Sequence, residues 1–192
     1  MSMDAITLQV MASALRTVAE EMEAALVRAA YSPNITERRD CSTALFDADG
    51  RMAVQSASIP VHLGAMPEAV EAVRERGAKA GDLWLVNDPY RGGTHLPDLT
   101  MISVLTLDGD PAGYAVTRAH HADVGGMAPG SMPAGSRELL QEGIVIPPVR
   151  LQAAGRDVAG VMDILLANTR TPMERAGDLR AQRAAHALAQ AR

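Results

Sequence analysis

The chain has 192 residues, of which 47% are hydrophobic, so it can form one domain with a sizeable core or a compact pair of domains. Aromatic residues make up only 3%, so we expect a core of aliphatic side chains and methionine. The net charge of −5 and the lack of a basic patch argue against a protein that binds nucleic acid. Cys41 is the only cysteine, which rules out an internal disulfide and favours a reducing cytoplasm. Neither a signal peptide nor a membrane span is predicted, because the apolar residues near the N-terminus are spaced and not continuous.

The first part of the sequence predicts a long helix followed by a hairpin. Apolar residues recur every three to five positions over residues 3–30, which is typical of an amphipathic core helix, and Ser-Pro-Asn at 32–34 ends it. Residues 42–47 and 51–56 are two short β-prone runs. The Asp-Gly pair between them is a strong turn signal, so we expect the two runs to form a β-hairpin.

The middle of the sequence predicts a helix, a buried strand and a second hairpin. Pro67 suits the first turn of a helix over residues 68–76, and the apolar run 83–86 is typical of a buried strand. Residues 99–107 and 112–119 flank an Asp-Gly-Asp-Pro turn. We expect these two segments to pair as antiparallel strands.

The remaining residues predict a loop and then a mostly helical region. Residues 125–135 are rich in Gly, Met, Pro and Ser, which is typical of a connector or of a lid over a site. We expect a short helical piece at 137–142, a short strand closed by prolines at 143–148, and two helices over 158–191 separated at Pro172. The fold class indicated is α+β, with antiparallel hairpins forming a sheet flanked by the N-terminal helix and the C-terminal helices.

Two groups of histidine and aspartate lie at the outer ends of the second hairpin. His95 and Asp98 precede its first strand in a Gly/Pro-rich loop, and His120, His121 and Asp123 follow its second strand. Strands joined by a tight turn run antiparallel, so these two ends should come together in space. Imidazole and carboxylate are ligands for Zn, Mn or Fe. We therefore expect His95, Asp98 and His120 to share one metal ion, and the alternative is a hydrogen-bonded polar network.

Several other positions have more than one interpretation. His62 either lines the site or is buried and hydrogen-bonded elsewhere. His186 is expected at the surface of the last helix, and Cys41 is expected to be a small buried residue and not a nucleophile. The Gly92-Gly93 pair is predicted to form a turn, with close approach of the backbone to a ligand as the alternative.

The alanine-rich helices over 158–191 also leave two alternatives open. They either pack on a partner or fold back onto the sheet of this chain. The sequence has neither a phosphate-binding loop nor a dinucleotide fingerprint, so we expect no nucleotide site.

Five separated motifs occur in order along the chain and resemble the N-terminal region of the hydantoinase B/oxoprolinase family. The resemblance extends from the first helix to the end of the chain. Family members include the B subunit of N-methylhydantoinase, the matching half of 5-oxoprolinase, caprolactamase, and a large subunit of acetone and acetophenone carboxylases. The motifs are Ser-Pro-Asn-Ile-Thr-Glu-Arg-Arg-Asp-Cys-Ser (32–42), Phe-Asp-Ala-Asp-Gly-Arg-Met (46–52), Pro-Val-His-Leu-Gly-Ala-Met (60–66), Asn-Asp-Pro-Tyr-Arg-Gly-Gly-Thr-His-Leu-Pro-Asp (87–98) and His-His-Ala-Asp-Val-Gly-Gly (120–126).

The resemblance implies a division of labour between two subunits. An A-type partner binds ATP and phosphorylates the substrate, whereas the B-type subunit holds a divalent metal and completes hydrolysis or carboxylation. Family B subunits are usually several hundred residues long. Residues 1–192 therefore correspond to the N-terminal metal-binding region of a hydantoinase B-like subunit.

The resemblance also implies a set of metal ligands. His95, Asp98 and His120 match the metal ligands of the family, in agreement with the pairing of the two hairpin ends. A further carboxylate comes from the Glu-Arg-Arg-Asp motif, where Asp40 is favoured over Glu37. Two imidazoles with carboxylates suit Zn, Mn or Fe and leave positions open for water or substrate.

These features together predict a cytoplasmic metal-bearing subunit of an ATP-dependent hydrolase of cyclic amides such as a hydantoin or oxoproline. His121 or Asp123 is expected to act as general base or to orient a metal ligand. The expected partner is a hydantoinase A-type ATP-binding subunit in a hetero-oligomer, with no nucleic acid and no membrane. The alternatives are a subunit of an acetone or acetophenone carboxylase acting on a ketone, and a non-catalytic metal-binding fragment that completes a complex.

Overall fold

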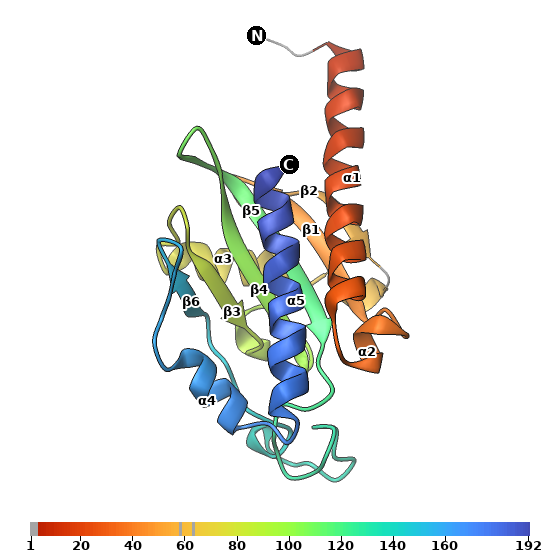
Figure 1. Ribbon diagram of the computed structural model, residues 1–192, viewed down its shortest axis with the longest axis vertical. Coiled ribbons are helices and arrows are strands. Elements are labelled where there is room, and N and C mark those ends of the chain that lie inside the picture. The colour runs from red at the N-terminus through yellow and green to blue at the C-terminus, as the bar shows by residue number, and fades with distance from the viewer. Residues whose placement is uncertain (1–3, 58, 63) are drawn as a thin grey trace.

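A seven-stranded antiparallel sheet with helices on both faces forms the body of the protein (Figure 1). A computed structural model describes residues 4–57, 59–62 and 64–192, and the strand order in its sheet is β2-β1-β5-β4-β3-β6-β7. The strands are β1 (Cys41–Asp47), β2 (Met52–Ala57), β3 (Leu83–Val86), β4 (Asp98–Leu107), β5 (Asp110–His120), β6 (Val149–Ala153) and β7 (Arg156–Asp157). The helices are α1 (Ala5–Ala29), α2 (Pro33–Thr36), α3 (Met66–Glu75), α4 (Val161–Ala167) and α5 (Pro172–Ala191), with short 3-10 turns at Pro60–His62, Pro89–Arg91 and Leu139–Gln141. The predicted α+β fold is confirmed.

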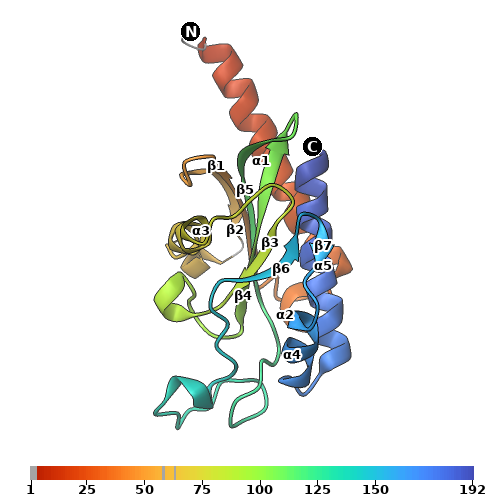
Figure 2. The same ribbon diagram turned by 90° about the vertical axis from the view of Figure 1, so that its left-hand side faces the viewer.

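The sheet lies between two helical layers, with α3 on one face and α4 and α5 on the other (Figure 2). Side chains alternate between the two faces along each strand, so the central strands bury side chains on both faces of the sheet. One core packs α3 against the sheet, and its buried members are Ala44, Phe46, Met66, Ala69, Val70, Val73, Trp84, Val86, Ile102 and Val116. The opposite core joins the C-terminal part of α1 to β1, β5 and α5, and its buried members include Met22, Leu26, Cys41, Ala119, Ala181 and Ala185.

Most of the expected elements form close to their predicted bounds. Both hairpins are present, the strand at Leu83–Val86 matches its prediction, and Pro172 begins α5 as the second of the two C-terminal helices. The predicted start of the first helix at residue 3 lies outside the described residues, and α1 begins at Ala5 after Asp4, whose carboxylate accepts hydrogen bonds from the first turn. None of the described helices is long and apolar enough to span a membrane.

The prediction of a strand at 143–148 is wrong. This segment is irregular, and the strand that pairs with β3 is β6, immediately after it. The Asn87 side chain and a few isolated backbone groups bond the segment in place of a sheet ladder. The Asn87 amide oxygen accepts from Ile146 N at 2.6 Å and its amide nitrogen donates to Ile144 O at 2.9 Å, while Ile146 O accepts from the backbone N–H of Asn87 at 3.0 Å. The two prolines that follow cannot donate to a ladder, so the regular pairing resumes only after them.

The prediction that His186 lies at the surface is also wrong, because α5 folds back onto the sheet. His186 is 4% exposed, and its two ring nitrogens lie 2.7 Å from Ser103 Oγ and 3.1 Å from Thr117 Oγ1. Small residues such as Ala185 allow α5 to approach the sheet closely enough for these contacts. Of the two alternatives for the alanine-rich region, the structure has the one in which its long helix covers the chain's own sheet.

Candidate metal centre

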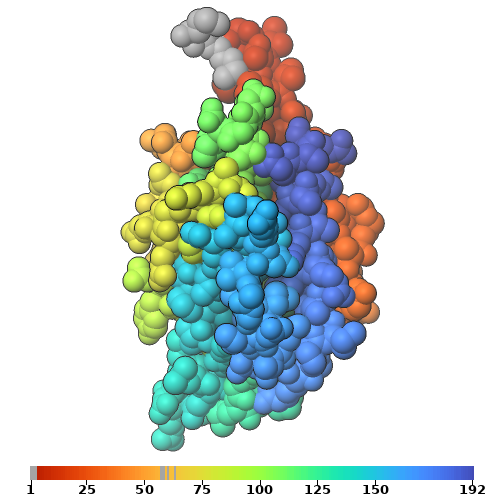
Figure 3. Space-filling model, turned by 60° about the vertical axis from the view of Figure 1, so that its left-hand side comes forward, coloured from red at the N-terminus to blue at the C-terminus, as the bar shows by residue number. Residues whose placement is uncertain are grey.

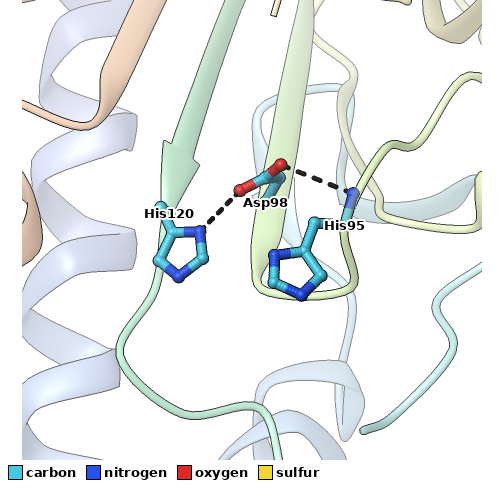
Figure 4. A group of neighbouring side chains, drawn as sticks. All are labelled: His95, Asp98 and His120. Atoms are coloured by element: carbon cyan, nitrogen blue, oxygen red, sulfur yellow. Dashed lines mark hydrogen bonds and ion pairs between the residues drawn. The ribbon is translucent and has the colours of Figure 1, made fainter. Parts of the chain in front are cut away.

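The pairing of β4 with β5 places the first residue of one strand opposite the last residue of the other. Asp98 and His120 are register partners, as the hairpin argument predicts. Their side chains point to the same face of the sheet, and His120 Nδ1 lies 2.8 Å from Asp98 Oδ1 (Figure 4).

His95 completes a compact group with this pair. It lies in the loop before β4, and its ring centroid is 5.4 Å from that of His120. One ligand atom from each of His95, Asp98 and His120 lies within 4.8 Å of the others. Both rings are partly buried whereas Asp98 is buried, so the group is open to solvent on one side.

The Asp98 carboxylate is held in its charged form. Burial alone would raise its pKa, but hydrogen bonds from His120 and Thr94 and the nearby His62 outweigh burial and hold the pKa at about 2. Thr94 Oγ1 donates to Asp98 Oδ2 at 2.7 Å, and the backbone N–H of His95 approaches the same oxygen at 3.4 Å. The loop that carries His95 therefore also fixes the carboxylate.

His62 links Asp40 to this group. Its Nε2 lies 3.6 Å from Asp40 Oδ1 and 3.9 Å from Asp98 Oδ2, and its Nδ1 lies 3.0 Å from Ser42 Oγ. Burial lowers the pKa of the His62 ring, which favours the neutral form. Both alternatives for His62 are therefore true, since it is buried and hydrogen-bonded and also lines the site.

Asp40 lies at the edge of the compact group. Its side chain is 25% exposed and its backbone carbonyl accepts from His120 N at 2.9 Å. Glu37 is exposed, so the geometry favours Asp40 over Glu37 as the carboxylate that faces the site.

An open cavity of about 610 Å³ lies over the group. Its lining residues are Asp40, Ile59, Val61, His62, Thr94, His95, Asp98 and His120. The polar wall carries the imidazoles and carboxylates, while Ile59 and Val61 supply an apolar wall. This volume and this mixture are typical of a site for a small molecule. Sequence analysis missed the apolar wall and Thr94, since neither carries metal-ligand chemistry.

The Gly92-Gly93 pair allows the His95 loop to pack directly on the protein's own backbone. Gly92 has φ +81°, and a Cβ on it would lie 2.1 Å from Ala69 N, at the start of α3. A Cβ on Gly93 would lie 2.0 Å from Asn87 O. The close approach raised as an alternative does occur, but to the start of α3 and the preceding loop. These glycines therefore set the position of His95.

We predict that Gly92→Ala destabilises the protein by about 2 kcal/mol and lowers its metal content, because the new methyl group would displace the loop from α3. Gly77→Ala is the matched control, since Gly77 has φ +70° but a Cβ on it would have no neighbouring atom within 4 Å. Urea unfolding and elemental analysis of both variants measure the effect. Equal destabilisation by the two substitutions would show that backbone strain, and not the contact with α3, explains the requirement for glycine.

Arg118 bonds the loop that carries His95 to strand β4, and sequence analysis did not identify it. The side chain is fully buried, its Nε donates to Thr100 Oγ1 at 2.7 Å, and its Nη2 donates to the carbonyl of Gly92. Burial lowers the pKa of the guanidinium to about 10, although the charge of Asp98 opposes this. The alternation of strand side chains could have revealed it, because Arg118 is two residues from His120 and shares its face.

The structure does not bring His121 and Asp123 into the group. His121 follows His120 directly, so its ring turns to the opposite face, where Nε2 lies 3.0 Å from Gln182 Oε1 on α5. Asp123 accepts from the backbone of Gly125 at 2.9 Å and pairs with Arg170 at 3.0 Å. Neither is among the described residues that line the cavity.

Two buried neutral histidines predict that the fold loses stability in mild acid. The pKa of both His121 and His186 is lowered to about 3, by burial in each case and, for His121, also by the charge of Arg175. In the unfolded chain the pKa of both rings returns to its ordinary value of 6.5. Below that pH the unfolded state binds more protons than the folded state, so the free energy of unfolding falls as the pH drops from about 6.5 toward 3.

Each of these rings contributes at most about 1.4 kcal/mol per pH unit within that window. Urea unfolding at about pH 7, 6 and 5 measures the slope, and His186→Gln should make it shallower. Stability that does not change between about pH 7 and 5 would contradict the burial of these rings in neutral form.

Comparison with known proteins finds one matching family and several long relatives. The family model described as hydantoinase B/oxoprolinase matches residues 4–192. An uncharacterized protein of Methanocaldococcus jannaschii is 40% identical, over 94% of this chain and 33% of that protein. A 5-oxoprolinase of Dictyostelium discoideum is 36% identical, over 96% of this chain and 15% of that protein. The caprolactamase subunit beta of Pseudomonas jessenii is 34% identical, over 94% of this chain and 32% of that protein.

Two solved structures share the fold. The crystal structure of ATP-dependent caprolactamase from Pseudomonas jessenii matches with a TM-score of 0.92 and 33% identity, over 100% of this chain and 34% of that one. A nucleotide-free acetone carboxylase structure matches with a TM-score of 0.86 over 93% of this chain and 24% of that one, but its 22% identity supports a common fold alone. The chain thus spans about a third or less of the length of these relatives.

Proposed function

Because this chain belongs to the hydantoinase B/oxoprolinase family, we propose that it is the metal-bearing part of an ATP-dependent enzyme that hydrolyses a cyclic amide. The observation that carries the proposal is the compact group of His95, Asp98 and His120 beneath an open cavity. The relatives named 5-oxoprolinase and caprolactamase favour a cyclic amide as the substrate. In this proposal, residues 1–192 are the metal-binding region of a larger enzyme.

The residues of the group fit a divalent transition metal. Two imidazoles and an ionised carboxylate are suitable donors for Zn, Mn or Fe, and the open side of the group leaves room for water or substrate. Asp40, which lines the same cavity, is the candidate for a further ligand. When bound, the metal would polarise a carbonyl group and lower the pKa of a bound water molecule.

The side chains around the group would position its ligands and the substrate. Thr94 holds Asp98, and His62 lies between Asp98 and Asp40, so both carboxylates are directed toward the same region. The apolar wall of Ile59 and Val61 would contact the methylene groups of a ring. A substrate with a polar amide and an aliphatic ring matches these two walls.

His121 and Asp123 act in this proposal as orienting residues and not as groups that contact the substrate. His121 ties the end of β5 to α5 through Gln182, and Asp123 fixes the loop that follows through Arg170. Both contacts restrict the backbone next to His120. The alternative role as general base receives no support from their positions.

The ATP-dependent step belongs to a partner in this proposal. The sequence of this chain has no phosphate-binding loop. The solved caprolactamase that it resembles is ATP-dependent, and the caprolactamase chain to which it is similar is called subunit beta. We propose an A-type subunit or domain that binds ATP and a hetero-oligomer in the cytoplasm, the location that the single reduced cysteine favours.

The test is reconstitution of the metal-loaded enzyme with an A-type subunit from a neighbouring reading frame. We expect hydrolysis of a hydantoin, 5-oxoproline or caprolactam that requires ATP, and we expect no ATP binding by this chain alone in calorimetry. Asp98→Asn should abolish the hydrolysis. Bicarbonate-dependent carboxylation of a ketone would replace this proposal with the carboxylase function, and no ATP-dependent turnover with any of these substrates would favour a non-catalytic assembly role.

A further inference from the structure

The N-terminal half of α1 is exposed although it carries several large apolar side chains and no charge. Residues 5–15 contain no charged side chain, whereas Arg16 begins a stretch with several charges. Ile6 is 78% exposed, Leu8 57%, and Val10 63%. The polar residues of this segment are the uncharged Thr7, Gln9 and Ser13, whereas a helix surrounded by water normally carries charges.

The exposed side chains of α1 lie on the same side of the helix as the side chains that pack against α5 and the sheet. Leu8, Met11 and Leu15 follow the three- and four-residue spacing that leads to Met22 and Leu26 further along the helix. Met22 and Leu26 are fully buried in the core shared with α5. One face of α1 is therefore covered in its C-terminal half and exposed in its N-terminal half.

The exposed half begins where α5 ends. Arg192 Nε lies 2.8 Å from Glu21 Oε2, so the last residue after α5 reaches α1 at that level. Beyond it α1 projects from the body of the protein in both ribbon views (Figures 1 and 2). The space-filling view shows the same red end of the helix extending past the rest of the molecule (Figure 3).

We propose that residues 5–15 of α1 are the docking surface for the part of the enzyme that corresponds to the unmatched length of its relatives. The Methanocaldococcus jannaschii relative and the caprolactamase subunit beta match this chain over only 33% and 32% of their length. About two thirds of each relative therefore lies outside the region that this fold accounts for. The unmatched region can belong to the same polypeptide or to a separate one. In both cases the proposal is that it packs on residues 5–15 of α1.

Two other occupants fit the surface less well. A second copy would meet it over about 16 Å of helix, which is short for the roughly 800 Å² per partner of a stable dimer. A membrane surface favours helices with Lys and Arg on the polar side, and residues 5–15 have neither. The inference concerns assembly alone, so it stands whether the metal site hydrolyses an amide or carboxylates a ketone.

The single native cysteine makes thiol labelling a suitable test. Cys41 is fully buried, and burial raises its pKa to about 12, so the wild-type chain should react very slowly with maleimide. Leu8→Cys and Leu15→Cys place a reactive thiol on the stripe. Ile164→Cys on α4 is the matched control, because Ile164 is also apolar and 61% exposed. Labelling rates are compared between the chain alone and the complete enzyme purified through a tag on this chain.

In the chain alone all three thiols should react rapidly. In the complete enzyme the thiols at positions 8 and 15 should react at least about tenfold more slowly, while the thiol at 164 should stay more reactive than either. Equal rates at positions 8 and 15 in both forms would overturn the proposal. Protection that appears in the chain alone and grows with its concentration would overturn it in favour of a second copy. The absence from the purified enzyme of any polypeptide region related to the unmatched part of the relatives would also overturn it.

Discussion

Replacing His95 or His120 with alanine is expected to weaken the binding of a divalent transition metal by at least about 100-fold, because loss of an outer-shell partner alone can cost up to that factor. Each imidazole is one of the three side chains whose ligand atoms lie within 4.8 Å of one another. Catalytic sites for such metals commonly use three protein ligands, and removing one imidazole leaves only two in the compact group, with Asp40 as the one further candidate. Calorimetric titration with Zn and Mn, together with elemental analysis of the purified protein, measures the loss.

His186→Gln is the control for this experiment. His186 is also a buried histidine, but its ring contacts Ser103 and Thr117 on the face of the sheet opposite to the group. The folded fraction of this variant should therefore keep wild-type metal content, even where its stability is lower. Wild-type protein that takes up no Zn, Mn, Fe, Co or Ni would refute the metal site, and full binding by the His95→Ala/His120→Ala double variant would place the ligands elsewhere.

The core of this site could be predicted from the sequence because the relevant contacts are set by one tight turn. An antiparallel hairpin brings its two outer ends together regardless of the rest of the fold, which is why Asp98 and His120 are found as register partners. The same reasoning separates His120 from His121, because adjacent residues of a strand point to opposite faces. The alternation of side chains along a strand therefore places His121 on the face opposite to the cavity.

The surroundings of the site could not be predicted in this way, since they depend on distant segments. His62 lies in a short turn before α3 and meets Asp40 and Asp98 only once α3 packs on the sheet. The alanine-rich pattern predicts that His186 lies at the surface, but the small side chains of α5 allow close packing on Ser103 and Thr117. No local pattern specifies which face of such a helix meets the sheet.

The irregular segment at 143–148 shows a further limit. Its apolar residues match a strand pattern, but its backbone bonds the side chain of Asn87 and isolated backbone groups such as Val124 O, and no regular ladder forms. A strand pattern reports that a segment is extended and buried. It does not report whether the hydrogen-bonding partner is a neighbouring strand or one polar side chain.

Asp178→Ala is expected to lower the free energy of unfolding by about 3 kcal/mol, because it leaves a buried charge and two backbone donors without their partner. Asp178 is fully buried on α5, and its Oδ1 accepts from Tyr31 N at 2.7 Å and Ser32 N at 3.0 Å. Its Oδ2 lies 3.0 Å from Nη2 of Arg175, which is 3% exposed and would keep only its contact with Glu174. Thermal unfolding should show a midpoint lower by roughly 6–12 °C for a domain of this size.

Two further variants separate the causes of this loss. Asp163→Ala removes an exposed carboxylate on α4 and should change stability by less than about 0.5 kcal/mol. The Arg175→Met/Asp178→Ala double variant should recover part of the loss, because it removes the buried charge while the N–H groups of Tyr31 and Ser32 stay unpaired. If the double variant is as unstable as Asp178→Ala, the backbone bonds at the start of α2 dominate. If Asp178→Ala itself costs less than about 1 kcal/mol, the link from α5 to the segment before Asp40 does not hold the fold together.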